Sequence, residues 1–203
     1  MWLQRGTAAL EVDVAAHVRA TPPGATCKGV LFSGIVEQAR RARPSFAPAR
    51  EAGVEDRRYL PFLNYPYADL IRLIPAAARA VFPTLRATEA IRRLGQGVFV
   101  DFRTTRSGRV LLGLMADDLG EVLMSAARAY SVTVTAGRFE TERLGRRRVC
   151  MRCEDYPGYL ETYDVGVFEG TLAYFREPGI VRATRSGPRS GVIDIEWGAP
   201  GGS

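Results

Sequence analysis

Apolar side chains recur every three or four residues through much of the first 130 positions, which is the period of an α-helix with one buried face. Pro75 lies within one such segment and lacks the amide that would bond to the carbonyl of Ile71, so we expect a kink or a restart there. Asp118 and Glu121 have the spacing of a capping box. The pattern predicts helices at residues 29–42, 66–82, 88–102, 107–115 and 119–130.

The period of the apolar positions changes to two after residue 137, as in a half-buried strand. In residues 148–154, for example, Val149, Met151 and Cys153 share one face. The same alternation predicts further strands at 138–144, 180–184 and 192–197, with a turn at Gly145, a helix at 161–176 and a loop at 186–191. The predicted fold class is α+β, with an N-terminal helical lobe packed on a C-terminal four-stranded antiparallel sheet in the order strand, strand, helix, strand, strand.

The length of 203 residues suits a single domain, which we expect to span residues 1–197. Within it, residues 1–28 are predicted as an N-terminal arm, with a strand or extended segment at 10–14 and a turn at 21–24. Residues 29–130 are predicted to be mainly helical, with a loop of at most one helical turn at 43–58, and residues 131–197 to form the sheet and its helix. The Gly- and Pro-rich residues 198–203 are predicted to be a disordered tail.

Glycine pairs interrupt two of the predicted helices. Gly95 and Gly97 lie in one, and Gly166 and Gly170 lie in the other. Each glycine weakens a helix by about 1 kcal/mol relative to alanine, so its presence favours a close approach by a neighbouring element.

The composition indicates the class of protein and the cellular compartment to expect. Apolar residues make up 46% and charged residues 25% of the chain, as in ordinary globular proteins, and no apolar run approaches the ~20 residues that cross a bilayer. We see no secretory signal at the N-terminus, and three cysteines are an odd number suited to a reducing compartment. We therefore expect a cytoplasmic protein that does not contact membranes.

Few residues suggest catalysis or metal binding. Cys150 and Cys153 have the spacing of a zinc or redox pair, and Cys27 with His17 would complete a nominal zinc set. Residues three apart on a strand point to opposite faces, however, so we interpret the two thiols as structural. The single histidine removes most routes to a catalytic triad or a histidine base.

A group of carboxylates follows the second predicted strand, but no neighbouring residue singles out an acid or a base among them. The sequence thus predicts a protein that is not an enzyme, with no catalytic residue, no metal and no cofactor. These carboxylates are Glu154, Asp155, Glu161, Asp164 and Glu169.

Arginine supplies almost all of the positive charge, since Lys28 is the only lysine among 28 basic residues and the net charge is +6. Arg146, Arg147 and Arg148 gather at the predicted hairpin tip, with Phe139 and Tyr156 near them in sequence. Such a patch could associate with nucleic acid through phosphate contacts and base stacking. The alternative is a charged edge that prevents sheets from pairing with one another, which we favour.

Six short motifs, in this order along nearly the whole chain, resemble a family of uncharacterised proteins known mainly from myxobacteria. The resemblance implies a shared fold rather than an activity. The motifs are TPPGATCKGVLF at 21–32, YPYADL at 65–70, IRRLG at 91–95, SGRVLL at 107–112, ARAY at 127–130 and GVFEG at 166–170.

A more distant similarity rests on the order of elements and on FETERLG at 139–145 followed by VGVFEG at 165–170. In these features the chain is similar to heme nitric-oxide/oxygen-binding domains and to the related vinyl-reductase and vesicle-transport ligand-binding domains. The resemblance implies a domain that encloses a small ligand or docks a partner. The helix that carries the proximal histidine in the heme proteins has none here at 123–130, and the propionate clamp is absent at 151–155. We therefore expect a heme-independent protein.

The leading hypothesis is a binding module, acting as sensor or adaptor, that holds a small apolar ligand or a protein partner between its helical lobe and its sheet. The alternative is nucleic-acid association through Arg146, Arg147 and Arg148. If no cavity exists, the pocket candidates are ordinary core. They are Leu119, Leu123, Ala127 and Tyr130 on a helix, facing Val149, Met151 and Phe168.

Overall fold

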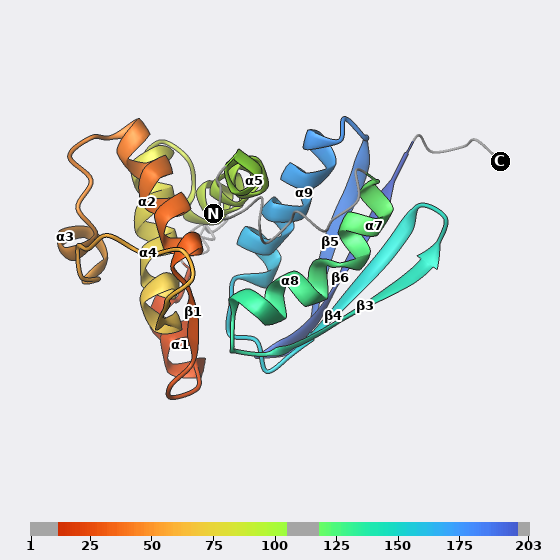
Figure 1. Ribbon diagram of the computed structural model, residues 1–203, viewed down its shortest axis with the longest axis horizontal. Coiled ribbons are helices and arrows are strands. Elements are labelled where there is room, and N and C mark those ends of the chain that lie inside the picture. Colours follow the sequence, from red (N-terminus) through yellow and green to blue (C-terminus); the bar gives the residue numbers. More distant parts are fainter. Residues whose placement is uncertain (1–11, 105–117, 199–203) are drawn as a thin grey trace, which may run out of the picture.

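The computed structural model describes residues 12–104 and 118–198 of the chain. Figure 1 shows the N-terminal helices on one side, the four-stranded sheet on the other, and the helices α5 and α9 side by side between them. The elements are α1 (Val14–Ala20), β1 (Thr26–Lys28), α2 (Gly29–Ala42), α3 (Pro48–Ala52), β2 (Asn64–Pro66), α4 (Tyr67–Val81), α5 (Ala87–Thr104), α7 (Leu119–Met124), α8 (Ala126–Thr133), β3 (Arg138–Gly145), β4 (Arg148–Glu154), a π-helical turn (Leu160–Asp164), α9 (Val165–Tyr174), β5 (Gly179–Gly187) and β6 (Ser190–Trp197).

The C-terminal sheet confirms the predicted α+β fold class. All of its neighbouring strands are antiparallel, in the order β3-β4-β6-β5, and α9 connects its two hairpins. On the inner face Val149 lies opposite Ile195 and Met151 lies opposite Ile193, and all four are at most 1% exposed. The predicted loop at 186–191 is wrong, because β5 and β6 extend to Gly187 and from Ser190 around a two-residue turn.

The predicted strand at residues 10–14 is wrong where the structure describes it, because Val14 begins α1. The Oδ1 atom of Asp13 accepts a hydrogen bond from the amide of Ala16 at 2.8 Å, which caps the helix. The alternation of apolar and charged residues that suggested a strand is therefore overridden by a capping residue. The predicted helix at 107–115 and residues 199–203 of the predicted tail lie outside the described residues.

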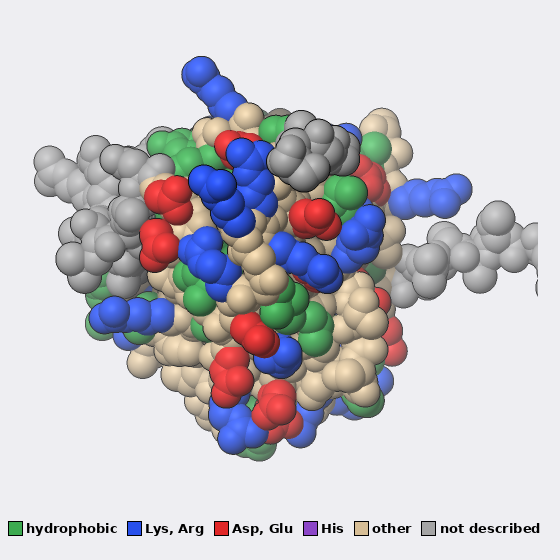
Figure 2. All heavy atoms as spheres, turned by 90° about the vertical axis from the view of Figure 1, so that its right-hand side faces the viewer, with side chains coloured by type: hydrophobic (Ala, Val, Ile, Leu, Met, Phe, Trp, Pro, Cys, Tyr) green, Lys and Arg blue, Asp and Glu red, His purple; other side chains and the backbone are tan. Residues whose placement is uncertain are grey.

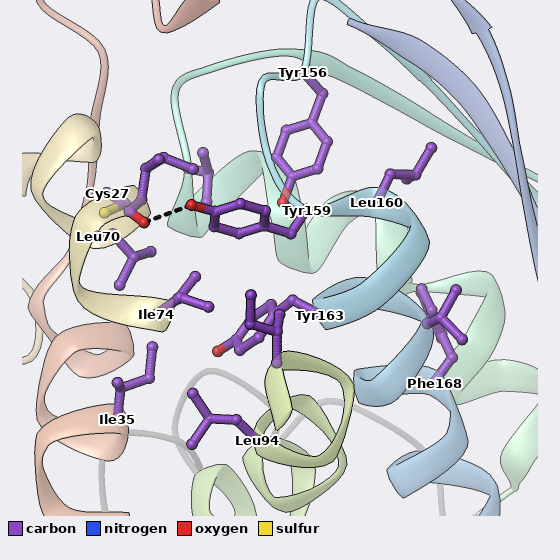
Figure 3. Packing of buried hydrophobic residues seen from close by; sticks show 14 of the residues in the cluster. Cys27, Ile35, Leu70, Ile74, Leu94, Tyr156, Tyr159, Leu160, Tyr163 and Phe168 are labelled. Atoms are coloured by element: carbon purple, nitrogen blue, oxygen red, sulfur yellow. Dashed lines mark hydrogen bonds between the residues drawn. The ribbon is translucent and has the colours of Figure 1, made fainter. Parts of the chain in front are cut away.

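Helix α4 continues through Pro75 as one helix, so the predicted restart does not occur there. Proline leaves the carbonyl of Ile71 without its helical donor. The hydroxyl of Tyr159 donates to this carbonyl at 2.8 Å, which is the hydrogen bond drawn as a dashed line in Figure 3. A side chain 88 residues away in sequence thus replaces the missing amide and ties α4 to the C-terminal half.

The predicted helix at 119–130 is divided at Ser125 into α7 and α8. The hydroxyl of Ser125 donates to the carbonyls of Glu121 and Val122, at 2.9 and 3.0 Å. Serine often bonds to the backbone in this way and bends helices. The capping residue of α7 is as predicted, since Oδ1 of Asp118 accepts from the amide of Glu121.

Two short strands, β1 and β2, were not predicted. They pair antiparallel, with Cys27 opposite Tyr65. Cys27 also forms an isolated bridge with Val134, which follows α8. Strands of three residues are too short to show an alternating pattern, although they join the helical lobe to the C-terminal half.

The glycine pairs confirm the predicted close approach of a neighbouring element, but the packing of Gly166 and Gly170 on the sheet, which we expected, is wrong, because both lie against helix α5. A Cβ atom at Gly166 would overlap the carbonyl oxygen of Arg92, and one at Gly170 would overlap that of Gln96. In return, a Cβ at Gly95 would overlap the carbonyl oxygen of Tyr163. Helices α5 and α9 therefore meet backbone to backbone, and the side chains of Arg92 and Gln96 bond to Glu169 beside the contact.

One hydrophobic core connects the helical lobe to the sheet, and its members come from both halves of the chain. Phe32, Ile71 and Leu94 represent the helical lobe in it, and Leu160 and Ile193 represent the C-terminal half. Among the described residues, no helix is long and apolar enough to span a membrane.

Candidate functional site

A cavity of about 140 Å³ lies on the boundary between the helical lobe and the C-terminal half. Helices α4 and α5 form one wall, and α7, α8, the π-helical turn and α9 form the other. In Figure 3, Leu70 and Ile74 of α4 face Tyr159 and Tyr163 across this boundary. The lining includes Leu31, Tyr67, Leu70, Ile74, Val98, Phe99, Leu123, Ala126, Ala129, Tyr130, Tyr156, Tyr159, Tyr163, Asp164, Val167, Phe168 and Thr171.

Asp164 is the only acidic or basic residue among the described residues of this lining, and it is 1% exposed. Its Oδ1 atom accepts hydrogen bonds from the hydroxyl of Tyr130 at 2.7 Å and from that of Tyr156 at 3.2 Å. Its Oδ2 atom is buried and has no hydrogen-bond partner among the described residues. The cavity thus combines an almost wholly apolar wall with one carboxylate whose second oxygen is unpaired.

The position of Asp164 depends on the π-helical turn. The amide of Asp164 donates to the carbonyl of Tyr159 at 3.3 Å, five residues back, before the chain continues as α9. Isolated π turns of this kind occur frequently at functional sites. The predicted helix at 161–176 treated most of this turn as regular α-helix, so the direction of the Asp164 side chain could not be inferred from regular helical spacing.

Burial is the largest influence on the pKa of the Asp164 carboxyl and raises it to about 6, although the two tyrosine hydroxyls and Arg185 oppose the shift. Burial likewise raises the pKa values of the surrounding tyrosines, and the nearby Asp164 charge adds to this effect. The phenols therefore remain neutral and act as hydrogen-bond donors. These tyrosines are Tyr67, Tyr130, Tyr156 and Tyr163.

Three of the seven pocket candidates, Leu123, Tyr130 and Phe168, line the cavity. The other four are buried but lie outside its lining. Val149 and Met151 lie on the inner face of the sheet, while Leu119 and Ala127 belong to the hydrophobic core outside the cavity.

The sequence did not identify Asp164 or the tyrosines around it as parts of one site. Asp164 was grouped with four other carboxylates, and its partner Tyr130 lies 34 residues away. One sequence signal does distinguish it, since Asp164 is the only charged residue in the apolar stretch from Thr162 to Phe168.

The arginines at the hairpin tip do not form a uniform basic patch. Arg148 pairs with Asp194, with Nε and Oδ1 3.0 Å apart, whereas Arg146 and Arg147 make no ion pair with a described residue. Figure 2 shows that acidic and basic side chains are interspersed on this side of the molecule. Arg138 on the edge strand β3 forms an ion pair with Glu154 on the neighbouring strand β4. This arrangement matches a charged edge more closely than a phosphate-binding surface.

Cys150 and Cys153 lie on opposite faces of β4, as the alternation predicts, and both are buried. Sγ of Cys153 donates to the carbonyl of Gly191 at 3.4 Å, and burial raises the pKa of this thiol to about 11. Burial also raises the pKa of Cys150. Reactive thiols have lowered pKa values, so neither cysteine has the character of a nucleophile. Within the described residues, no three metal-ligating side chains come together.

Solved structures of H-NOX proteins share this fold. An H-NOX protein from S. oneidensis in the Fe(II)NO ligation state has a TM-score of 0.64 at 13% identity, over 85% of this chain and 99% of that one. An Fe(II) unliganded H-NOX protein from K. algicida has a TM-score of 0.63 at 11% identity, over 85% and 97%. An oxygen-binding H-NOX domain related to soluble guanylate cyclases has a TM-score of 0.62 at 16% identity, over 85% and 96%.

The residues of the cavity do not fit heme. The single histidine, His17, lies on α1, where its Nδ1 is 2.6 Å from the carbonyl oxygen of Pro157, and it does not line the cavity. The part of the lining that the structure describes contains no cysteine, methionine or arginine, and so offers neither an axial thiolate or thioether ligand nor a propionate partner. Burial keeps the lining phenols neutral, which disfavours a tyrosinate ligand. A cavity of this size resembles the engineered ~150 Å³ cavity that binds benzene.

Sequence comparison assigns the family. None of the curated proteins matches the sequence. A family model described as "Protein of unknown function (DUF2378)" matches residues 20–198, which is most of the chain. The chain therefore belongs to this family of proteins of unknown function, and its fold is that of H-NOX domains.

Proposed function

We propose that this protein is a non-enzymatic binding module that holds a compact, mostly apolar small molecule in the cavity between its two halves, without heme, and acts as a sensor. The observation that carries this proposal is the cavity itself, because close packing normally leaves few voids larger than a water molecule. A void of about 140 Å³ between two halves of a domain is a suitable place for a ligand.

The position of the cavity supports a sensing role. Its two walls belong to different halves of the molecule, and a ligand between them would contact α4 and α8 together. Binding that favours one arrangement of the two halves would shift their equilibrium. A cytoplasmic location is part of the proposal, supported by three cysteines that are all unpaired thiols.

Nucleic-acid association through Arg146, Arg147 and Arg148 receives no comparable support. Arg148 is neutralised by Asp194, and the acidic side chains among the arginines would repel phosphates. A small apolar ligand is therefore the better candidate.

The test is binding of benzene, an apolar probe of suitable size. We expect benzene to raise the melting temperature of the wild-type protein in a concentration-dependent manner, because it binds only the folded state. The variant Ala126→Leu places additional methyl groups in the cavity and should abolish this shift. Ala87→Leu adds the same groups at an exposed position and should retain it. An unchanged melting temperature in the wild type, or an equal shift in Ala126→Leu, would contradict the proposal.

A further inference from the structure

We propose that the ligand of this cavity is a small organic amine bound as its cation, whose ammonium group donates a hydrogen bond to Oδ2 of Asp164. This inference rests on the proposed function, since it specifies the chemistry of the molecule that the same cavity binds.

One oxygen of the Asp164 carboxylate lacks a hydrogen-bond donor among the described residues. Oδ1 of Asp164 has two donors, the hydroxyls of Tyr130 and Tyr156, whereas buried Oδ2 has none among the described residues. Buried polar atoms in folded proteins nearly always have a partner. A hydrogen-bond donor on a ligand that enters the cavity would supply this partner.

The negative charge of Asp164 also favours a cationic ligand. Among the described residues, the lining contains one carboxylate and no lysine, arginine or histidine. Arg185 acts on Asp164 electrostatically from β5, but its own guanidinium bonds to Glu161 and to the carbonyls of Gly158 and Pro188. A buried carboxylate without a counter-charge beside it is costly, and a cation offsets this cost where a neutral donor does not.

The aromatic rings in the wall of the cavity favour a cation as well. Faces of aromatic rings attract cations, and aromatic cages bind ammonium groups. The rings of Tyr130 and Phe168 are stacked with centroids 6.5 Å apart, and Tyr156 stands edge-on to Tyr130. The carboxylate and these rings together favour a cation, while the apolar remainder of the wall suits a hydrocarbon body about the size of benzene.

The experiment compares three probes of similar shape by isothermal titration calorimetry at pH 7.5: benzylamine, which is cationic, benzyl alcohol, which is a neutral donor, and toluene. We expect benzylamine to bind at least about tenfold more tightly than toluene, as a charge-assisted hydrogen bond implies. Benzyl alcohol should lie between them. The variant Asp164→Asn should remove the preference for benzylamine over toluene.

The pH dependence supplies a second measurement that requires no variant. Protonation of Asp164 removes its charge, so the preference for benzylamine over toluene should decline as pH falls from 7 to 5. The pKa values of the tyrosines and of Cys153 are raised, so these groups do not change their protonation between pH 5 and pH 7. His17 contacts Tyr159, and burial lowers its pKa, so the toluene affinity at each pH serves as the control for its titration. The groups that face Asp164 are Tyr67, Tyr130, Tyr156, Tyr163, Cys153 and Arg185.

The outcomes separate the two proposals. If toluene binds as tightly as benzylamine in the wild type, or if benzyl alcohol is the tightest probe, the amine inference is overturned while the apolar binding site stands. If none of the probes binds, both proposals fail. A preference that persists at pH 5 or in Asp164→Asn would show that the carboxylate does not select the ligand, and would also overturn the inference.

Discussion

The boundary between the helical lobe and the C-terminal half is closed where α5 meets α9 and hollow where α4 faces α8. At the closed part, Gly95, Gly166 and Gly170 allow two backbones to touch. At the hollow part, tyrosine rings stand between the elements, and hydroxyl bonds such as that from Tyr159 to Ile71 fix their orientation. The space between two packed helices thus depends on a few side chains. Glycines let the helices touch, whereas tyrosine rings held by hydrogen bonds keep them apart and leave a space of ligand size.

The largest effect is expected at the closed part. Gly166→Ala places a methyl group on the carbonyl of Arg92, and neither backbone can move without separating the two helices. Overpacking of this kind costs about 3 kcal/mol or more, in spite of the better helix propensity of alanine. Urea unfolding would measure the loss of stability.

The matched control for this substitution is Gly34→Ala in α2, where a Cβ would meet no atom within 4 Å. It should stabilise the protein by about 0.5 to 1 kcal/mol through helix propensity alone. Equal effects of the two substitutions would show that the close contact between α5 and α9 is unimportant for stability.

The next effect concerns the carboxylate of the hollow part. Because burial raises the pKa of Asp164 to about 6 from 3.8, the folded protein retains a proton between these pH values that the unfolded chain has lost. The contribution of this group to stability therefore increases as pH falls through 6 and decreases as pH rises. The shift of roughly two pKa units corresponds to on the order of 2 to 3 kcal/mol.

Asp164→Asn should lack this dependence. The free energy of unfolding of the wild type minus that of the variant should rise by that amount between pH 7.5 and pH 4, measured by urea unfolding in the absence of ligand. The absolute difference at one pH also contains changes in hydrogen bonding to Tyr130 and Tyr156, so the trend with pH is the quantity to compare. A constant difference would mean that Asp164 titrates normally in the folded state.

A pair of adjacent alanines distinguishes hollow from filled space. Ala126 and Ala127 are 8% and 9% exposed, but only Ala126 lines the cavity. Ala127→Leu should cost about 2 kcal/mol by overpacking, whereas Ala126→Leu should be close to neutral because its methyl groups enter empty space. Thermal unfolding of the two variants would compare them directly, and equal costs would indicate that the cavity closes in solution.

Sequence patterns predicted the elements whose stabilising contacts are local or periodic. The alternation in β4 and the helical spacing in α2, α4 and α5 agree with the structure. The close contact of α5 with α9 was also predictable, because glycine within a helix has a known cost. The division at Ser125 was missed because serine is neutral in a periodicity analysis and acts only through its hydroxyl.

The candidate site was less predictable, because it forms from residues that are distant in sequence. Leu123 and Tyr130 were proposed from an apolar helical stripe and Phe168 as a residue facing it, but Tyr67 and Tyr156 join them only through the fold. Asp164 joins the lining at a π-helical turn that has no periodic signature. Tertiary hydrogen bonds, rather than local propensity, determine this part of the molecule.

The smallest effect tests how α4 is held at the edge of the hollow part. Tyr159→Phe removes the hydroxyl that donates to the carbonyl of Ile71 and should cost about 1.5 kcal/mol, because a buried carbonyl loses this partner. In the background Pro75→Ala the helix supplies its own amide to Ile71, so the same substitution should cost about 1 kcal/mol less. A double-mutant cycle by urea unfolding would measure this coupling. Zero coupling would show that the tyrosine hydroxyl does not substitute for the missing amide and that α4 tolerates Pro75 for another reason.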